Sequence, residues 1–392
     1  MTEKRLCPSC GKPNINVFYK VGNVPVHSVL NLDTREKAIQ YPKGSVELGF
    51  CQYCGFIFNT VFDPSLPEYT SGYEATQTFS PTFNAFHQKL ATELIKRYGL
   101  RNKTVIEIGC GNGEFLTLLC KLGDNKGVGF DPSFNAQRLP PEGKNRVSFI
   151  KDFYSEKYSN LDADFIYSKM TLEHIHDPAD FISMIRRSIK KDDTTVFFQL
   201  PEVRRILRDL AFWDIYYEHS SYFSRGSLAR LFRGCGFDVL DLWTEYDNQY
   251  LMVTARINRA KKSTILSQED DIDALSKEMD YFAKNTPKRI AQWRQKIYGI
   301  RDRGKRVVIW SASSKGVAFL TTLGIQDEIE YVVDINPYRQ GYYMAGSGQR
   351  IVGPDFLKDY RPDAVIAMNP IYKEEIKNIL GERELYPEVF AV

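Results

Sequence analysis

The segment 104–115 constrains the fold of this chain more than any other feature. It reads Thr-Val-Ile-Glu-Ile-Gly-Cys-Gly-Asn-Gly-Glu-Phe, and its apolar start predicts a buried strand. Gly109, Gly111 and Gly113 then allow a tight turn and a close approach of the backbone to a ligand. Apolar residues beyond the turn predict a helix, and a second apolar run predicts another strand at 127–130. Strand, turn, helix and strand in this order predict an α/β fold with a doubly wound, Rossmann-like parallel sheet.

The length of the chain predicts more than one domain. A single hydrophobic core rarely grows beyond about 250–300 residues, and this chain has 392. A second alternation of strand, small-residue turn and helix begins near residue 306, after a stretch with helical spacing of apolar residues. We therefore expect a cysteine-containing module at 1–70, a cofactor domain at 71–257, a helical linker at 258–300 and a Rossmann-like βα lobe at 301–392.

The composition favours a cytoplasmic protein that acts on a small molecule. Lys and Arg number 52 and Asp and Glu number 49, so the net charge of +3 predicts no broad basic surface for nucleic acid. No apolar run approaches the roughly 20 residues that span a bilayer. The polar start Met1–Lys4 does not resemble a signal peptide.

Two Cys-x-x-Cys pairs, each followed by glycine, stand near the amino terminus. They are Cys7 with Cys10, and Cys51 with Cys54. Four thiolates in two close pairs can close a tetrahedral shell around zinc, and a closed shell leaves no position open for substrate. We therefore expect a structural zinc-binding module; a redox pair or an iron–sulfur cluster is the alternative.

A carboxylate follows the glycine turn at the distance that a nucleotide cofactor requires. Asp131 ends the second predicted strand about 20 residues after the turn, where it can hold the two ribose hydroxyls. A dinucleotide enzyme would carry a third glycine at the position of Glu114. The Gly-x-Gly-x-Gly form therefore favours a methyltransferase over a dehydrogenase.

At these residues the sequence resembles the class I S-adenosylmethionine (SAM)-dependent methyltransferases. The resemblance implies that Glu107 and the three glycines form the first motif, that Asp131 binds the ribose, and that Asp152 and Phe153 lie at the adenine. The run 168–178 is similar to the fourth motif of that family, which lines the methionine end. The resemblance thus implies that Met170, Glu173 and His174 contact the cofactor; a solvated loop or a helix cap is the alternative for Asp152 and Glu173.

The stretch 214–224, Asp-Ile-Tyr-Tyr-Glu-His-Ser-Ser-Tyr-Phe-Ser, places ionisable groups among aromatic rings. Such a mixture can form a partly dry pocket in which a neighbouring carboxylate and phenol tune the proton affinity of His219. An aromatic core segment with a hydrogen-bonded histidine is the alternative.

This stretch resembles the Tyr-x-Glu-His-x-x-Tyr-Phe-Ser motif of the zinc-containing sugar C-methyltransferases, which act on nucleotide-linked deoxy-ketosugars. That family also has a four-cysteine module, a class I methyltransferase domain and a C-terminal βα lobe. The resemblance implies that Tyr216, Glu218, His219 and Tyr222 form the catalytic acceptor site. Either His219 or Glu218 would serve as the base.

The C-terminal lobe matches that family less closely. Ile309-Trp-Ser-Ala-Ser-Ser-Lys-Gly316 lacks the leading glycines of the family motif but keeps its Lys315 and the strand-end Asp334. By resemblance, Lys315 and Asp334 contact the acceptor or its nucleotide. We expect Tyr73, in a polar connector or lid at 61–80, to do the same.

These features predict SAM-dependent methylation of a carbon atom in a sugar or nucleotide-linked ketosugar, through an enolate. Oxygen or nitrogen methylation of another small metabolite is the alternative. The chain also resembles the zinc-containing ribosomal RNA methyltransferases, but its near-neutral charge disfavours that function. A non-enzymatic scaffold is disfavoured by the intact glycine turn and Asp131.

Overall fold

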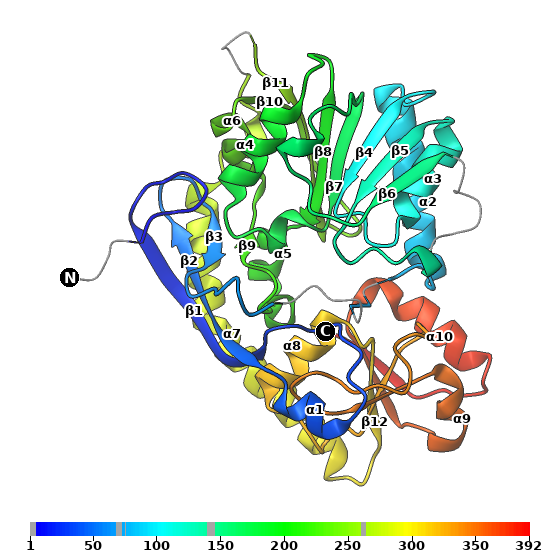
Figure 1. Cartoon of the computed structure of the whole chain (residues 1–392). Helices are drawn as coiled ribbons and strands as arrows, with labels where there is room; N and C mark the ends of the chain where they lie inside the picture. The colour runs from blue at the N-terminus through cyan, green and yellow to red at the C-terminus, as the bar shows by residue number, and fades with distance from the viewer. Residues whose placement is uncertain (1–4, 68–72, 75, 139–145, 260–263) are drawn as a thin grey trace.

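The computed structural model describes residues 5–67, 73–74, 76–138, 146–259 and 264–392. Part of the connector predicted at 61–80 lies outside these residues. Three sheets organise the chain, and Figure 1 shows them as an N-terminal ladder in blue, a central sheet in green and cyan, and a C-terminal sheet in orange and red. None of the helices in the described residues is long and apolar enough to cross a membrane.

The central sheet is mixed and has the strand order β10-β11-β8-β7-β4-β5-β6. Six strands run in one direction and β11 runs antiparallel to both its neighbours, so the sheet is mixed where the glycine-turn pattern alone predicted parallel strands. The strands are β4 (Thr104–Ile108), β5 (Lys126–Phe130), β6 (Val147–Ile150), β7 (Phe165–Lys169), β8 (Thr195–Pro201), β10 (Phe237–Glu245) and β11 (Tyr250–Ile257).

Helices cover both faces of this sheet because neighbouring strand residues point to opposite sides. Val105, for example, packs with α2 and α3, while Ile106 packs with α4 and α6. The helices are α2 (Pro81–Tyr98), α3 (Glu114–Gly123), α4 (Pro178–Ser188), α5 (Val203–Arg208) and α6 (Arg225–Gly234).

The N-terminal sheet is completed by a strand from the far side of the central domain. Its order is β1-β2-β3-β9, with β1 (Ile15–Pro25), β2 (Lys43–Cys51), β3 (Ile57–Asn59) and β9 (Ser221–Tyr222). The short helix α1 (Arg35–Gln40) joins β1 to β2. Because β9 belongs to the predicted acceptor motif, the N-terminal sheet holds that motif directly.

The 30-residue helix α7 (Ile272–Arg301) runs beside β1 and joins the N-terminal sheet to the C-terminal lobe (Figure 1). One apolar core continues through β1, β2, α5, α7, β12 and α8. The N-terminal sheet therefore packs as one unit with the C-terminal lobe.

The C-terminal lobe is a parallel five-stranded sheet of order β14-β13-β12-β15-β16. Counted from β12, this order is 3-2-1-4-5, so the strand sequence reverses direction between β12 and β15, where ligands of open α/β sheets bind. Its elements are β12 (Val307–Trp310), α8 (Ser314–Leu323), β13 (Tyr331–Val333), β14 (Arg350–Val352), α9 (Leu357–Tyr360), β15 (Ala364–Ala367), α10 (Lys373–Gly381) and β16 (Glu388–Ala391).

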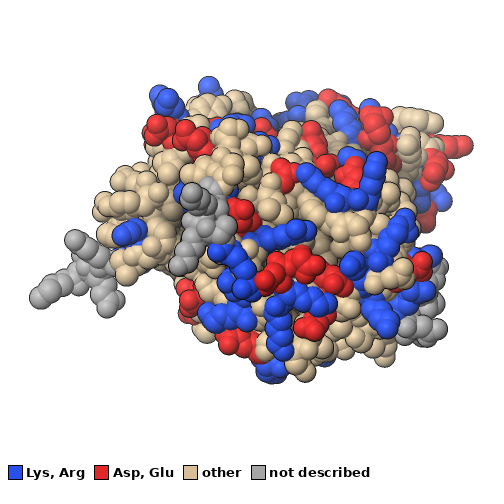
Figure 2. Space-filling model, turned by 90° about the horizontal axis from the view of Figure 1, so that it is seen from above, with Lys and Arg blue, Asp and Glu red and all other residues tan. Residues whose placement is uncertain are grey.

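Positive and negative side chains are interleaved over the face that Figure 2 shows, which is the molecule of Figure 1 seen from above. Lys and Arg groups on this face stand next to Asp and Glu groups. The face therefore lacks the continuous positive surface that attracts a polyanion.

Candidate active site

The glycine turn after β4 adopts a backbone that only glycine accommodates without strain. Gly109, Gly111 and Gly113 have φ values of 74°, 54° and 79°. A Cβ atom at Gly109 would lie 2.1 Å from Thr171 Oγ1, and one at Gly113 would lie 2.3 Å from the Phe149 ring. Gly111 instead faces open space, so a ligand can approach its backbone.

A cleft of about 740 Å³ lies at the carboxyl ends of the parallel strands of the central and C-terminal sheets. Walls come from the turn after β4, from the acceptor motif, from Tyr73 and from the turn after β12. The predicted site residues that line it are Tyr73, Gly109, Gly111, Asp131, Asp152, Phe153, Met170, Glu173, His174, Tyr216, His219, Lys315 and Asp334. Glu107, Gly113, Glu218 and Tyr222 are not among the lining residues.

Asp131 and Asp334 occupy equivalent positions in the two sheets. Asp131 Oδ2 accepts a 2.8 Å hydrogen bond from Gly111 N in the preceding turn, and Oδ1 accepts one from Ser133 N. Asp334 Oδ2 accepts a 2.7 Å bond from Ala312 N in its own preceding turn, and Oδ1 accepts one from Asn336 N. Each sheet thus presents a strand-end carboxylate to the same cleft.

Glu173 is a buried carboxylate that faces the cleft. Neither of its oxygens has a hydrogen-bond partner among the described residues, and burial raises its pKa to about 8. An unpaired buried carboxylate is costly unless a cation or a proton neutralises it. The position suits a cationic ligand group.

Met170 and Asp152 lie at two other parts of the cleft. Met170 has a φ of 52°, a strained value for a residue with a side chain, and its N–H donates to Gln199 O. Asp152 is held by hydrogen bonds from Lys157 and Tyr158, which lower its pKa to about 2, while the neighbouring Phe153 ring is 67% exposed. Asp152 is therefore a charged group at the rim of the cleft.

Glu107 lies behind the glycine turn. Burial raises its pKa to about 8, although the positive charge of nearby Lys169 acts against that rise. Lys169 itself is buried with a pKa lowered to about 7 by that burial, and its Nζ lies 3.5 Å from the centre of the Phe115 ring. Glu107 thus supports the strand beneath the turn and does not line the cleft.

His219 and Tyr216 stand together in the cleft wall. Their ring centres are 4.1 Å apart, and the ring of His174 meets that of His219 edge-on at 4.9 Å. Burial, with the nearby His174 and Lys315, lowers the pKa of His219 well below its usual value, so the ring is uncharged at neutral pH. Burial raises the pKa of Tyr216, so its phenol stays protonated.

Glu218 points away from the cleft and is fully engaged by the N-terminal module. Its Oε1 lies 2.6 Å from His27 Nδ1, and its Oε2 accepts a hydrogen bond from Ser28 Oγ. Burial favours the neutral acid, but His27 and Ser28 outweigh that effect and lower the pKa of Glu218. A carboxylate with both oxygens occupied and a low pKa is a poor proton acceptor for a substrate.

Two further tyrosines of the acceptor motif, Tyr217 and Tyr222, lie against the N-terminal sheet. Tyr222 is buried on β9, and its hydroxyl has no partner among the described residues. Tyr217 donates its hydroxyl to Asp63 O and accepts from Asp63 N at 2.9 Å, and its ring would collide with a side chain at Gly44. The motif is therefore anchored to the N-terminal sheet on both sides of Glu218 and His219.

Lys315 joins the C-terminal lobe to the acceptor segment. Its Nζ lies 2.8 Å from Asp214 Oδ1, and Asp214 also accepts two hydrogen bonds from Arg205, at 2.8 and 2.9 Å. All three residues line the cleft, and burial lowers the pKa of Lys315. Arg205 and Asp214 were not predicted from the sequence, because only the fold brings them to Lys315.

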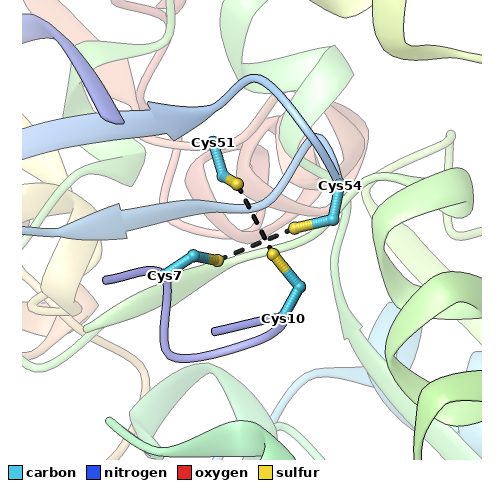
Figure 3. Close-up of side chains that lie close together, drawn as sticks. All are labelled: Cys7, Cys10, Cys51 and Cys54. Carbon is cyan, nitrogen blue, oxygen red and sulfur yellow. Dashed lines mark hydrogen bonds between the residues drawn. The ribbon is translucent and has the colours of Figure 1, made fainter. Parts of the chain in front are cut away.

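The four cysteines lie together at the start of the N-terminal sheet. Their sulfur atoms are all within 4.8 Å of one another, and the Cys7–Cys54 and Cys10–Cys51 distances are both 3.7 Å (Figure 3). Four sulfurs at the 2.3 Å bond length of zinc would be separated by about 3.8 Å at tetrahedral corners. The donor set and its spacing thus fit zinc.

Two family models match the chain in succession. The model described as a methyltransferase domain matches residues 83–242, and that described as a C-methyltransferase C-terminal domain matches residues 251–384. The glycine turn, Asp131 and these matches define a SAM-dependent methyltransferase. In this succession of a methyltransferase domain and a C-methyltransferase C-terminal domain, the chain is similar to the C-methyltransferases.

A curated relative and two solved structures extend the comparison. The C-methyltransferase NovU of Streptomyces niveus is 26% identical over 304 residues, which cover 74% of this chain and 72% of that protein. A SAM-dependent methyltransferase of Aquifex aeolicus is 18% identical, covering 50% of this chain and 99% of its own, with a TM-score of 0.35. The 1,6-didemethyltoxoflavin-N1-methyltransferase of Burkholderia thailandensis is 16% identical, covering 52% and 96%, with a TM-score of 0.35.

Proposed function

We propose that this enzyme methylates a carbon atom next to the ketone of a sugar, most simply a nucleotide-linked ketosugar. The observation that carries the proposal is the shared cleft, in which an uncharged histidine, His219, faces the same space as the glycine turn. The C-methyltransferase C-terminal domain and the likeness to NovU support carbon as the methylated atom.

SAM supplies an electrophilic methyl group on a sulfonium and leaves as the neutral thioether S-adenosylhomocysteine. Gly111 gives it access to the backbone, Asp131 offers a carboxylate to the ribose, and Glu173 offers an unpaired carboxylate to a cationic group. These three features suit a ligand that carries both a ribose and positive charge.

His219 removes the proton from the carbon next to the ketone, and the resulting enolate carbon bonds to the methyl group. Tyr216, which stays protonated, donates a hydrogen bond to the oxygen that gains negative charge. The carbon–proton bond breaks, the carbon–methyl bond forms, and the proton remains on His219 until solvent takes it. Alignment of the enolate with the methyl group and removal of the proton are the contributions of the protein.

In this proposal the C-terminal lobe binds the nucleotide part of the acceptor, which is not methylated. The turn after β12 opens α8, so its backbone N–H groups can hold an anion, and Asp334 lies where a strand-end carboxylate binds a ribose. Lys315 contributes positive charge next to the same turn. A nucleoside diphosphate carries both an anionic group and a ribose.

Mass spectrometry of reactions with methyl-labelled SAM and a panel of nucleotide-linked ketosugars tests the proposal. We expect a product that gains one labelled methyl group on carbon, shown by fragmentation and by NMR of the product. Label on oxygen or nitrogen, or activity only on other metabolites, would contradict it. Free ketosugars without the nucleotide serve as the control, and we expect them to react poorly.

We also propose that Cys7, Cys10, Cys51 and Cys54 hold one structural zinc ion. The 3.7 Å sulfur separations and the four-thiol donor set support this assignment. Such a site fixes the start of β1 to the turn between β2 and β3, and four protein ligands exclude a direct role in the reaction.

A further inference from the structure

The segment 26–32, which follows β1, connects three parts of the cleft. His27 and Ser28 bind Glu218 of the acceptor motif. Leu30 forms an antiparallel bridge with Tyr73, and Arg339 of the C-terminal lobe donates to Leu30 O at 2.7 Å. A segment of the N-terminal module therefore contacts the acceptor motif, Tyr73 and the C-terminal lobe.

His27 is a buried residue of this segment and contacts both Glu218 and Tyr73. It is fully excluded from solvent, its Nδ1 lies 2.6 Å from Glu218 Oε1, and its ring centre is 5.3 Å from that of Tyr73. His27 does not line the cleft, whereas Tyr73 does. It can therefore act on the reaction only through the residues that it holds.

Glu218 is connected in turn to His219, the proposed base. The ring of His174, whose pKa is influenced by the main chain of Glu218, meets the ring of His219 edge-on at 4.9 Å. His219 is also the next residue in the chain, so the backbone of Glu218 fixes the start of its side chain. Displacing the Glu218 carboxylate would move both histidines.

We propose that His27 is a positioning residue for methyl transfer, which fixes Glu218 and thereby sets the orientation of His219 and His174 in the cleft. This role rests on the function proposed above. It also gives the N-terminal module a part in the reaction besides carrying the cysteine cluster. The contact between His27 and Glu218 could not be predicted from the sequence, since the two residues are 191 positions apart.

Substitution of His27 tests the proposal in the full-length enzyme. His27→Ala removes the 2.6 Å contact with Glu218, and we expect kcat to fall about ten- to a hundredfold, less than on loss of the base itself. His27→Asn can place an amide N–H near the position of Nδ1, and we expect it to restore most of kcat. His87→Ala, which removes another buried histidine, on α2 and outside the residues that line the cleft, is the matched control.

NMR of the histidines gives a readout that needs no acceptor. The chain has five histidines, so selective ¹³C and ¹⁵N labelling resolves each ring. In His27→Ala and in Glu218→Gln we expect the signals of His174 and His219 to shift, and in the folded His87→Ala control we expect them to stay in place.

Unchanged His174 and His219 signals in folded His27→Ala would overturn the positioning role, whatever the acceptor proves to be. Equal loss of kcat in His27→Ala and His27→Asn, with the same fall in melting temperature, would also overturn it, because it would reduce His27 to a packing residue. Failure of the proposed function alone would leave the NMR shifts intact, so the two failures can be told apart.

Discussion

A histidine that removes a proton from carbon must be uncharged before it reacts. Burial keeps His219 uncharged because it lowers the pKa of the ring. Because its pKa is lowered well below the usual 6.5, His219 stays neutral as pH falls toward that value. We expect the acid limb of the profile of kcat/KM against pH to lie below pH 6.5. A limb at or above pH 7 that disappears in His219→Ala would contradict this environment.

His219→Ala should remove the base and leave the cofactor site intact. We expect turnover to fall about 100- to 10,000-fold, with SAM affinity by calorimetry almost unchanged. Glu218→Ala should also lower turnover, but through the contacts to His27 and Ser28, so we expect its residual activity to keep the pH dependence of the parent enzyme. Near-parent turnover in both variants would assign the motif to packing.

Asp131→Ala should weaken cofactor binding. The carboxylate organises the turn through Gly111 N and faces the cleft, so its loss removes both a ligand contact and the support of the turn. SAM should raise the melting temperature of the parent enzyme, because it binds the native state, and raise it much less in Asp131→Ala. Asp192→Ala, on an exposed ion pair with Arg259, should behave like the parent.

For single residues, the sequence predicted which side chains belong to the site better than it predicted which other side chains they contact. The glycines and Asp131 could be predicted because their spacing along one strand, turn and helix determines where they lie. Glu218 could not be assigned, because its environment comes from His27 and Ser28 in another module. Glu107 matches the methyltransferase motif, yet its neighbours Tyr167 and Lys169 keep it behind the cleft.

The short strand β9 is held in place mainly by its pairing with β3. It has two residues, and its pairing with β3 ties the acceptor motif to the sheet that the cysteines begin. Damage at the cysteines should therefore reach the cleft through β3 and β9.

Cys10→Ser should lower zinc content, stability and activity together. We expect elemental analysis to find about one zinc per chain in the parent and much less in the variant, with a lower melting temperature and reduced turnover. Cys235→Ser, which changes a half-buried cysteine outside the cluster, is the matched control. Full activity in zinc-free protein, or iron in place of zinc, would contradict the proposal.

The elements of the central and C-terminal sheets could be predicted from the sequence because their patterns are local. The strand predicted before the glycine turn is β4, the strand predicted at 127–130 is β5 to within one residue, and the second alternation predicted near residue 306 begins with β12. The antiparallel N-terminal ladder was not predicted, and a strand as short as β9 has no period to detect. Its existence follows from a partner more than 150 residues away.

At the scale of the whole molecule, the packing does not follow the predicted domain boundaries. The core around α7 takes Phe212 and Trp213 from the central segment, and Phe212 stacks on Phe319 of α8. The segment 71–257 excised alone would expose this apolar surface. We expect the fragment to aggregate or to bind a hydrophobic dye, whereas the full chain stays monodisperse by light scattering; a well-folded, cooperative fragment would contradict this.

The pairing of β3 with β9 also bears on the order in which the chain can fold. The cysteine pairs and β1 to β3 leave the ribosome before β9, the last strand of their sheet, which follows after about 160 further residues, or roughly 10 to 30 s of synthesis. Until then β3 has an open edge, and open edges recruit other strands. Early metal capture would hold this ladder together during the wait, so the cysteine cluster would protect the nascent chain as much as the finished enzyme.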